Sequence, residues 1–173
     1  VKTGELLADI VTSSQVEFDE DGFLEMILGL QLDEKIVGVL HTTNDRVADA
    51  VIDEGTKILF GRDYYNEEIL GLKFKVSIFS FFQTNIPAIE RLYSDALDLL
   101  PDIDSKNVFD LYCGTGTITQ LMASRARHVT GIEIVQDSVD SALANAKING
   151  IDNCDFICGD VLKVIGQVDE KPD

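Results

Sequence analysis

The spacing of apolar residues in the first half of the chain predicts mainly strands. Over residues 72–78, apolar and polar side chains alternate with the period of two that marks a half-buried strand. Further apolar runs predict strands over residues 5–12, 35–42, 47–52 and 56–60, with a short helix over 23–30 and a turn at 53–55. We therefore expect a small α+β unit over residues 1–80.

The second half, residues 81–173, alternates helical and strand patterns. Asn85 and Pro87 predict the start of a helix that turns Ile89, Leu92, Ala96 and Leu99 inward and ends before residue 101. Strands are expected over residues 108–112, 129–134 and 155–158, with helices over 117–124 and 138–149. Right-handed crossovers then give a parallel sheet with the order third, second, first. The predicted fold class is α/β.

A glycine turn lies between the first two of these strands. The first apolar run breaks at Gly114 and Gly116, and the second ends on Glu133. Glycine allows positive φ and close approach of a ligand, and the amides at the start of the following helix suit a carboxylate or a phosphate. A carboxylate at position 133 can accept both hydroxyls of a ribose, so we expect a nucleoside-bearing cofactor.

The details of this turn favour S-adenosylmethionine. A dinucleotide fingerprint needs a third glycine where this chain has Thr119, and no Gly-Lys-Ser/Thr follows the turn. S-adenosylmethionine carries its own carboxylate, and Asp110 suits its positive groups. A lone Gly-x-Gly is more often only a tight turn, so the interpretation depends on the preceding strand and the following acid.

Three segments together resemble the RNA uracil-5 methyltransferases, which form 5-methyluridine in 23S ribosomal RNA and, in a sister branch, in transfer RNA. They are Ser80-Phe81-Phe82-Gln83-Thr84-Asn85, Asp110-Leu111-Tyr112-Cys113-Gly114-Thr115-Gly116-Thr117 and Gly131-Ile132-Glu133. Residues 2–5 and 70–77 are similar to the region that precedes the cofactor domain in that family. The resemblance covers nearly the whole chain, and we favour the ribosomal RNA branch. It implies a Rossmann-like S-adenosylmethionine methyltransferase sheet, truncated, after the small α+β domain.

The resemblance also implies a set of cofactor-binding residues: Gln83, Tyr112, Gly114, Gly116, Thr117, Glu133 and Asp160. Many family members have asparagine at the position of Thr117, which leaves a side-chain contact there open. Two positions have ordinary structural alternatives. Gln83 could make a hydrogen bond at a helix start, and Tyr112 could be a core aromatic at a strand end.

The catalytic groups of the family, a cysteine nucleophile and a carboxylate base, lie downstream of these motifs. We therefore expect this chain to be an interior fragment without catalytic residues, inactive alone. Cys113 is expected to be a buried, inert thiol. The spacing of Cys154 and Cys158 and the isolation of His41 and His128 support no metal site.

Charge and composition limit the partners. Thirty-one acidic and 14 basic residues give a formal net charge of −17, which repels RNA, so RNA is expected to bind only the longer enzyme. The acidic clusters at residues 19–21 and 102–104 are expected to be solvated loops. No apolar run is long enough to cross a membrane, and three cysteines without framework spacing suit the cytoplasm.

The first strand of the predicted parallel sheet has an uncovered edge. Without a neighbouring strand on that side, apolar side chains stay exposed, and the burial free energy that is lost is comparable to the stability of a whole domain. We therefore expect self-association, strand exchange, or packing of the first unit across this edge. Other functions stay open: a methyltransferase for another substrate, a nicotinamide-dependent oxidoreductase, and a non-catalytic scaffold.

Overall fold

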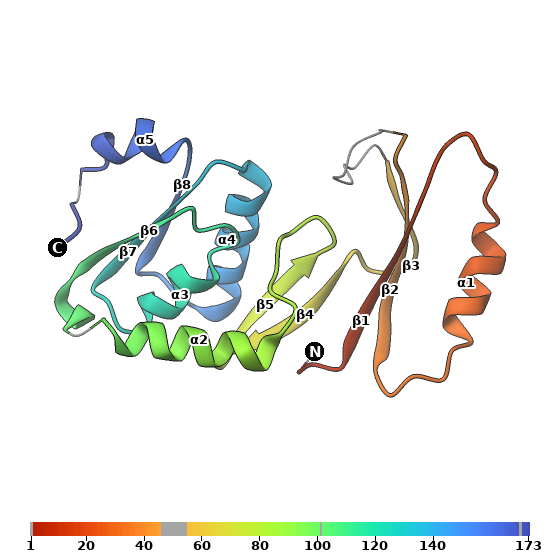
Figure 1. Ribbon diagram of the computed structural model, residues 1–173, viewed down its shortest axis with the longest axis horizontal. Coiled ribbons are helices and arrows are strands. Elements are labelled where there is room, and N and C mark those ends of the chain that lie inside the picture. Colours follow the sequence, from red (N-terminus) through yellow and green to blue (C-terminus); the bar gives the residue numbers. More distant parts are fainter. Residues whose placement is uncertain (1, 46–54, 101, 170) are drawn as a thin grey trace. The chain divides into compact units, whose positions relative to one another are not determined.

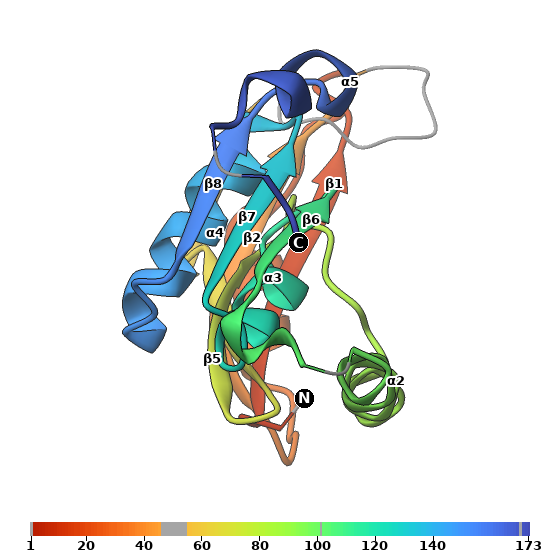
Figure 2. The same ribbon diagram turned by 90° about the vertical axis from the view of Figure 1, so that its left-hand side faces the viewer.

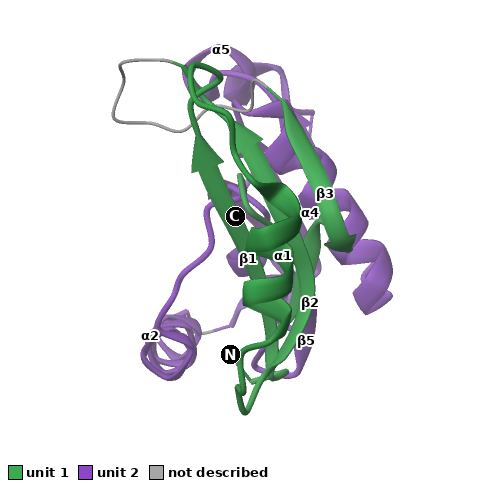
Figure 3. Cartoon of the chain, turned by 90° about the vertical axis from the view of Figure 1, so that its right-hand side faces the viewer, with its two compact units in different colours: residues 1–67, 76–79 green, residues 68–75, 80–173 purple. Residues whose placement is uncertain are grey.

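The computed structural model describes residues 2–45, 55–100, 102–169 and 171–173, and divides the chain into two compact units (Figures 1 and 3). Unit 1 comprises residues 1–67 and 76–79, and unit 2 comprises residues 68–75 and 80–173. Among the described residues, no helix has the length and apolar composition needed to span a membrane.

Unit 1 contains a three-stranded sheet with one helix. Its strands are β1 (Glu5–Thr12), β2 (Lys35–Thr43) and β3 (Thr56–Gly61), in that order. Strands β1 and β2 are parallel, and β2 and β3 are antiparallel. These strands confirm the sequence prediction. The strand expected over residues 47–52 and most of the turn at 53–55 lie outside the described residues.

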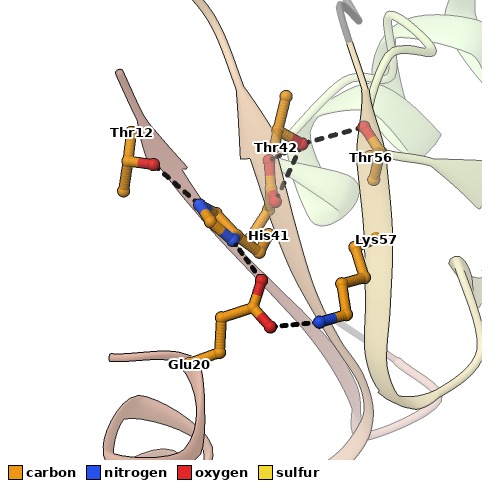
Figure 4. Close-up of polar contacts among 7 residues, drawn as sticks. Thr12, Glu20, His41, Thr42, Thr56 and Lys57 are labelled. Carbon is orange, nitrogen blue, oxygen red and sulfur yellow. Dashed lines mark hydrogen bonds and ion pairs between the residues drawn. The ribbon is translucent and has the colours of Figure 1, made fainter. Parts of the chain in front are cut away.

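Helix α1 (Glu20–Leu28) begins three residues earlier than predicted. The Asp19 carboxylate caps it by accepting a hydrogen bond from Gly22 N at 3.0 Å. Glu20 binds Lys57 and lies 2.8 Å from His41 Nδ1, while His41 Nε2 lies 2.7 Å from Thr12 Oγ1 (Figure 4). The prediction of a solvated loop at residues 19–21 was therefore wrong, because two of these acids cap and anchor α1.

The hairpin of β4 (Tyr64–Ile69) and β5 (Leu72–Ser77) is a separate two-stranded sheet. Leu70 and Gly71 connect the strands with φ of 48° and 85°, the positive values that two-residue hairpin turns require. Strand β4 was not predicted. Its inner positions include Glu67, only 1% exposed, whose carboxylate accepts a hydrogen bond from Lys2 N at 3.0 Å. An acid at a buried position interrupts the alternation of apolar and polar residues, and the sequence pattern therefore did not predict this strand.

Unit 2 is built on a parallel sheet in the predicted order β8-β7-β6 (Figure 2). Its strands are β6 (Asn107–Leu111), β7 (His128–Glu133) and β8 (Cys154–Cys158). The crossover helices are α3 (Thr117–Ala123) and α4 (Gln136–Asn149). Val129 and Cys154 join Met122 of α3 and Ala146 of α4 in one buried cluster, so both helices cover the same face.

Three short elements of unit 2 were not predicted: η1 (Ile103–Ser105), α5 (Val161–Val164) and η2 (Ile165–Gln167). Each is no longer than four residues, too short to carry a periodic apolar signal. Asp102 and Asp104 are exposed, as expected, but they flank and enter the short helix η1, whose Ile103 is buried.

Helix α2 (Ile86–Asp98) begins as predicted, with the Asn85 carboxamide accepting a hydrogen bond from Ala88 N at 3.2 Å. Its inward face was predicted wrongly in part. Ile89 is buried, but Leu92 and Leu99 are 58% and 80% exposed, and Ala96 is exposed. The buried and half-buried apolar positions are Ile86, Ile89, Tyr93 and Leu97, an alternative stripe that the same apolar spacing allows.

Two asparagines of α4 bind the backbone of β5 as a neighbouring strand would. Asn149 accepts from Lys73 N and donates to Lys73 O, both at 2.8 Å. Asn145 accepts from Lys75 N at 2.8 Å and donates to Lys75 O at 3.4 Å. Four residues of helix rise about 6 Å and two residues of strand about 6.6 Å, so the two periods match. This pairing attaches residues 68–75 to unit 2.

Candidate functional site

The glycine turn connects β6 to α3 through a strained backbone. Tyr112, Gly114 and Gly116 all have positive φ, at 65°, 54° and 73°. The amides of Tyr112 and Cys113 both donate to Ile132 O, at 2.8 and 3.1 Å. For a residue with a side chain, positive φ is uncommon and persists where surrounding bonds hold it. Here the neighbouring strand β7 supplies those bonds.

Glu133, the last residue of β7, turns its carboxylate onto this bend. Its Oε2 accepts a hydrogen bond from Gly114 N at 3.0 Å. Its Oε1 accepts from Ile134 N at 2.8 Å and from Val135 N at 2.9 Å. The sequence predicted that the acid and the turn would meet, because parallel neighbours end at the same edge of a sheet. The structure joins them by a direct hydrogen bond.

A cavity lies over the turn, entirely within unit 2. Four of the predicted site residues line it together: Gln83, Tyr112, Gly114 and Thr117. Tyr112 is 69% exposed, so it is not a core aromatic. The helix start near Gln83 is capped by Asn85, so the capping alternative for Gln83 does not hold. The remaining predictions, Gly116, Glu133 and Asp160, do not line this cavity.

The two glycines of the turn have different reasons to lack a side chain. A Cβ at Gly114 would meet nothing within 4 Å. A Cβ at Gly116 would lie 2.6 Å from the Phe156 ring and 2.9 Å from the Ala142 Cβ. Gly116 therefore lets β8 and α4 pack against the turn, whereas Gly114 faces the cavity. A ligand contact at Gly116 stays a prediction.

Thr119 replaces the third glycine of a dinucleotide fingerprint with a structural side chain. It is fully buried, and its hydroxyl donates to Asp110 Oδ2 at 2.6 Å. Burial raises the pKa of the Asp110 carboxyl despite the hydrogen bonds from Thr119 that oppose the shift. Asp110 thus binds Thr119 within the turn and does not line the cavity, and a contact with the cofactor's positive groups stays a prediction.

Cys113 lines the cavity but has the character of an inert thiol. It is half-buried, and burial, followed by the charges of Asp110 and Glu133, raises its pKa to about 12. A thiol acts as a nucleophile only as its thiolate, so these surroundings suppress its reactivity. Within the described part of the chain, no group of three or more potential metal-binding side chains occurs.

Asp160 has a local structural role. Its Oδ1 accepts a hydrogen bond from Leu162 N at 3.0 Å, which caps α5, and its Oδ2 lies 3.5 Å from Lys163 Nζ. The strand end that carries it is next to β7, because Gly159 N donates to Glu133 O at 2.8 Å. A contact between Asp160 and a cofactor stays a prediction.

Several cavity residues were not selected from the sequence. They are Ile69, Phe81, Phe82, Tyr93, Thr115 and Ile118. Phe81 and Phe82 directly precede Gln83 in the motif of residues 80–85, and this position could have identified them as cavity residues. Ile69 comes from the β4–β5 hairpin, and nothing in the sequence relates it to the turn. Burial and the charge of Asp110 raise the pKa of Tyr93.

Comparisons with known proteins agree with this fold. Residues 103–173 match the family described as "Methyltransferase domain". Over 90% of its length, the chain superimposes on a Pyrococcus abyssi tRNA (uracil-54, C5)-methyltransferase solved with S-adenosyl-L-homocysteine, with a TM-score of 0.67 and 21% identity, covering 36% of that protein. The fold is that of a Rossmann-like methyltransferase. This confirms the predicted fold class.

Two relatives match almost the whole chain. Proteins of Clostridium tetani and Caldanaerobacter subterraneus, both named uncharacterized RNA methyltransferases, are 49% and 51% identical over 171 and 172 residues. Each match covers 99% of this chain and 38% of the relative. The chain therefore spans well under half of the length of these relatives.

Proposed function

We propose that unit 2 binds S-adenosyl-L-methionine and that the chain is the cofactor-binding portion of an RNA methyltransferase. The observation that carries the proposal is the hydrogen bond between Glu133 and the glycine turn, beside a cavity lined by Gln83, Tyr112 and Thr117. The bound cofactor supplies an electrophilic methyl group on a sulfonium. The protein contributes binding and orientation of that group.

The residues present fit such a cofactor. The Glu133 carboxylate can accept a ribose hydroxyl, and the exposed ring of Tyr112 can pack on an apolar or cationic part of the ligand. Gly114 leaves open space where a side chain would stand. A dinucleotide site has its third glycine at the position that the buried Thr119 occupies in this chain. This difference disfavours the oxidoreductase alternative.

The substrate we propose is a uridine in RNA, methylated at C5, with 23S ribosomal RNA preferred. The names of the two bacterial relatives support RNA, and the likeness to the Pyrococcus enzyme supports uracil-C5 chemistry. That neighbour acts on tRNA, which makes tRNA uracil-5 methylation the second candidate. In either case the uracil must leave its base stack to reach the methyl group, and other segments of the longer protein supply the nucleophile and base.

The net charge of −17 bears on how RNA binds. Phosphate contacts require basic surface, and a chain with 31 acidic against 14 basic residues repels a polyanion, so we propose that other segments supply most of the RNA contacts. We expect the chain alone to bind cofactor but not RNA and to transfer no methyl group. Self-association through β6, the terminal strand of the unit 2 sheet, is part of this proposal. Light scattering that gives a monomer would argue against it.

Calorimetric titration with S-adenosylhomocysteine and with NAD tests the cofactor assignment. We expect binding of S-adenosylhomocysteine and no measurable binding of NAD. The Glu133→Ala variant should weaken the first, whereas Glu25→Ala, an exposed acid on α1, should leave it unchanged. Preferential binding of NAD would overturn the proposal. Equal affinity of the Glu133→Ala variant and the unaltered chain would favour the non-catalytic scaffold.

A further inference from the structure

The cavity in unit 2 has two walls that come from distant parts of the chain. One wall is the glycine turn with the first residues of α3, Thr117 and Ile118. The other wall includes Ile69, the last residue of β4, and Phe82, which follows the β4–β5 hairpin. Apolar side chains of this kind contact the carbon-rich parts of a ligand, and a small increase in separation already loses much of that attraction. Binding therefore depends on the spacing of the two walls.

Asn149, the last residue of α4, connects the elements behind both walls. Its side chain accepts a hydrogen bond from Lys73 N and donates one to Lys73 O, both at 2.8 Å, and so holds β5. Its Nδ2 also donates to Gln120 Oε1 at 2.9 Å. Gln120 is fully buried in α3, three residues after Thr117. One carboxamide thus binds the hairpin and α3 at the same time.

The position of β5 determines where the hairpin wall lies. Phe74 of β5 is fully buried, and its ring centroid lies 6.0 Å from that of Phe82. Ile69 belongs to β4, which pairs with β5. Asn145 binds the β5 backbone one helical turn before Asn149. Movement of β5 away from α4 would therefore carry Ile69 and Phe82 away from the glycine turn.

We propose that Asn149 is a positioning residue for the cofactor. Its hydrogen bonds to β5 and α3 set the spacing between the hairpin wall and the glycine-turn wall, and thereby the affinity of the cavity for S-adenosylmethionine. The inference rests on the proposed function, because it requires the cofactor to occupy this cavity. Asn149 does not line the cavity itself, so it acts through residues that do, of which Ile69 is one.

A double-mutant cycle, measured by calorimetry with S-adenosylhomocysteine, tests this role. Asn149→Ala and Ile69→Ala should each weaken binding about 3- to 10-fold. The loss in the double variant should fall well short of the product of the two single losses, because Asn149 acts through the position of Ile69. A double variant whose loss equals that product would overturn the inference. Unchanged affinity in either single variant would also overturn it.

Asn153→Ala is the matched control for a general loss of stability. The Asn153 carboxamide donates to Ala123 O at 2.8 Å and to Ala126 O at 3.1 Å, at the end of α3 and in the connection that follows. Like Asn149→Ala, this variant loses side-chain hydrogen bonds to the backbone, but these bonds do not involve the hairpin. Its affinity for S-adenosylhomocysteine should equal that of the unaltered chain. Equal losses in Asn153→Ala and Asn149→Ala would overturn the positioning role.

Hydrogen exchange in the unaltered chain tests the same coupling without a variant, and it decides if Asn149→Ala does not fold. If the bond between Asn149 and Lys73 favours cofactor binding, binding must favour that bond equally, by thermodynamic linkage. S-adenosylhomocysteine should therefore slow exchange at the Lys73 amide by a larger factor than at the Ile151 amide, which donates to Ala146 O just after the same helix. Equal slowing of both amides would contradict the coupling.

The outcomes separate the two levels of the argument. No binding of S-adenosylhomocysteine to the unaltered chain defeats the proposed function itself. Binding to the unaltered chain that persists with the same affinity in Asn149→Ala defeats only the positioning role.

Discussion

Gly114 N and Glu133 Oε2 are 3.0 Å apart, although the two residues are separated by 19 positions in the chain. This hydrogen bond joins the glycine turn after β6 to the acid at the end of β7. In this structure the Gly114 amide therefore donates to the protein's own carboxylate.

The two glycines of the turn should respond differently to alanine. Gly114→Ala is expected to cost about 1–2 kcal/mol of unfolding free energy, from the left-handed φ alone. Gly116→Ala adds an overlap with Phe156 and Ala142, worth about 1–3 kcal/mol more. Urea denaturation measures both. Gly150→Ala, with φ of 65° and open space around its Cβ, is the control and should match Gly114→Ala. Equal costs at all three glycines would contradict this account.

The asparagines of α4 should hold the hairpin to unit 2. Asn149→Ala removes both hydrogen bonds to Lys73, and we expect a loss of about 1–3 kcal/mol, since the strand's amide and carbonyl lose their partners. Hydrogen exchange at the Lys73 amide should accelerate in the same variant. Lys147→Ala, an exposed change on the same helix, should alter neither quantity. Unchanged exchange at Lys73 in Asn149→Ala would show that other contacts hold β5.

For the buried amide of Gln120 we expect, in contrast to Asn149, that its removal does not destabilise the chain. Its Nε2 has no hydrogen-bond partner among the described residues, although its Oε1 accepts from Asn149 Nδ2 at 2.9 Å. An unsatisfied buried donor is unfavourable by about 1–3 kcal/mol, so Gln120→Met should be close to neutral, or stabilising, in thermal unfolding. Gln120→Ala, which leaves a cavity, should destabilise by about 2 kcal/mol or more. A large loss in Gln120→Met would indicate that the amide is satisfied by bound water.

The anchoring of α1 should depend on pH through Glu20. Hydrogen bonds from Lys57, then from His41, lower the pKa of Glu20 in the folded chain. A lowered carboxyl pKa means that the folded state binds fewer protons, so this stabilisation is present above the ordinary glutamate pKa of about 4.3 and lost as pH falls below it. Glu20→Gln should therefore unfold at lower urea than the unaltered chain at pH 7, and this difference should shrink as the pH falls towards 3. The Glu25→Gln variant serves as the control. A difference that is the same at pH 7 and pH 3 would contradict the prediction.

The three cysteines should differ in reactivity. Burial raises the pKa of Cys113 to about 12 and that of Cys154 to about 11, whereas Cys158 is exposed. At pH 8 a thiol with pKa near 12 is about one part in ten thousand thiolate. Ellman's reagent should therefore titrate one fast thiol in the native chain, lost in Cys158→Ser, and three after denaturation. Fast reaction at Cys113 would contradict the assignment of an inert thiol.

Sequence reasoning performed best where a local pattern had one structural solution. The parallel strands and crossover helices of unit 2 were predicted within a few residues, because apolar runs separated by glycine and acid have few alternatives. It failed where a polar residue is buried or an apolar residue is exposed. Strand β4 was missed because Glu67 occupies a buried position, and the inward face of α2 was misassigned because Leu92 and Leu99 fit a helical period as well as the residues that are buried.

The sequence by itself determined the order of strands and crossover helices in the unit 2 sheet, the meeting of a glycine turn with an acid, and the absence of a third glycine. These follow from steric and periodic rules that act over a few residues. Only the tertiary structure decided which groups Glu133 binds, that Gly116 is small because Phe156 and Ala142 press against it, and that Ile69 from the hairpin joins the cavity. Such contacts depend on distances between segments far apart in the chain, and a linear pattern does not specify these distances.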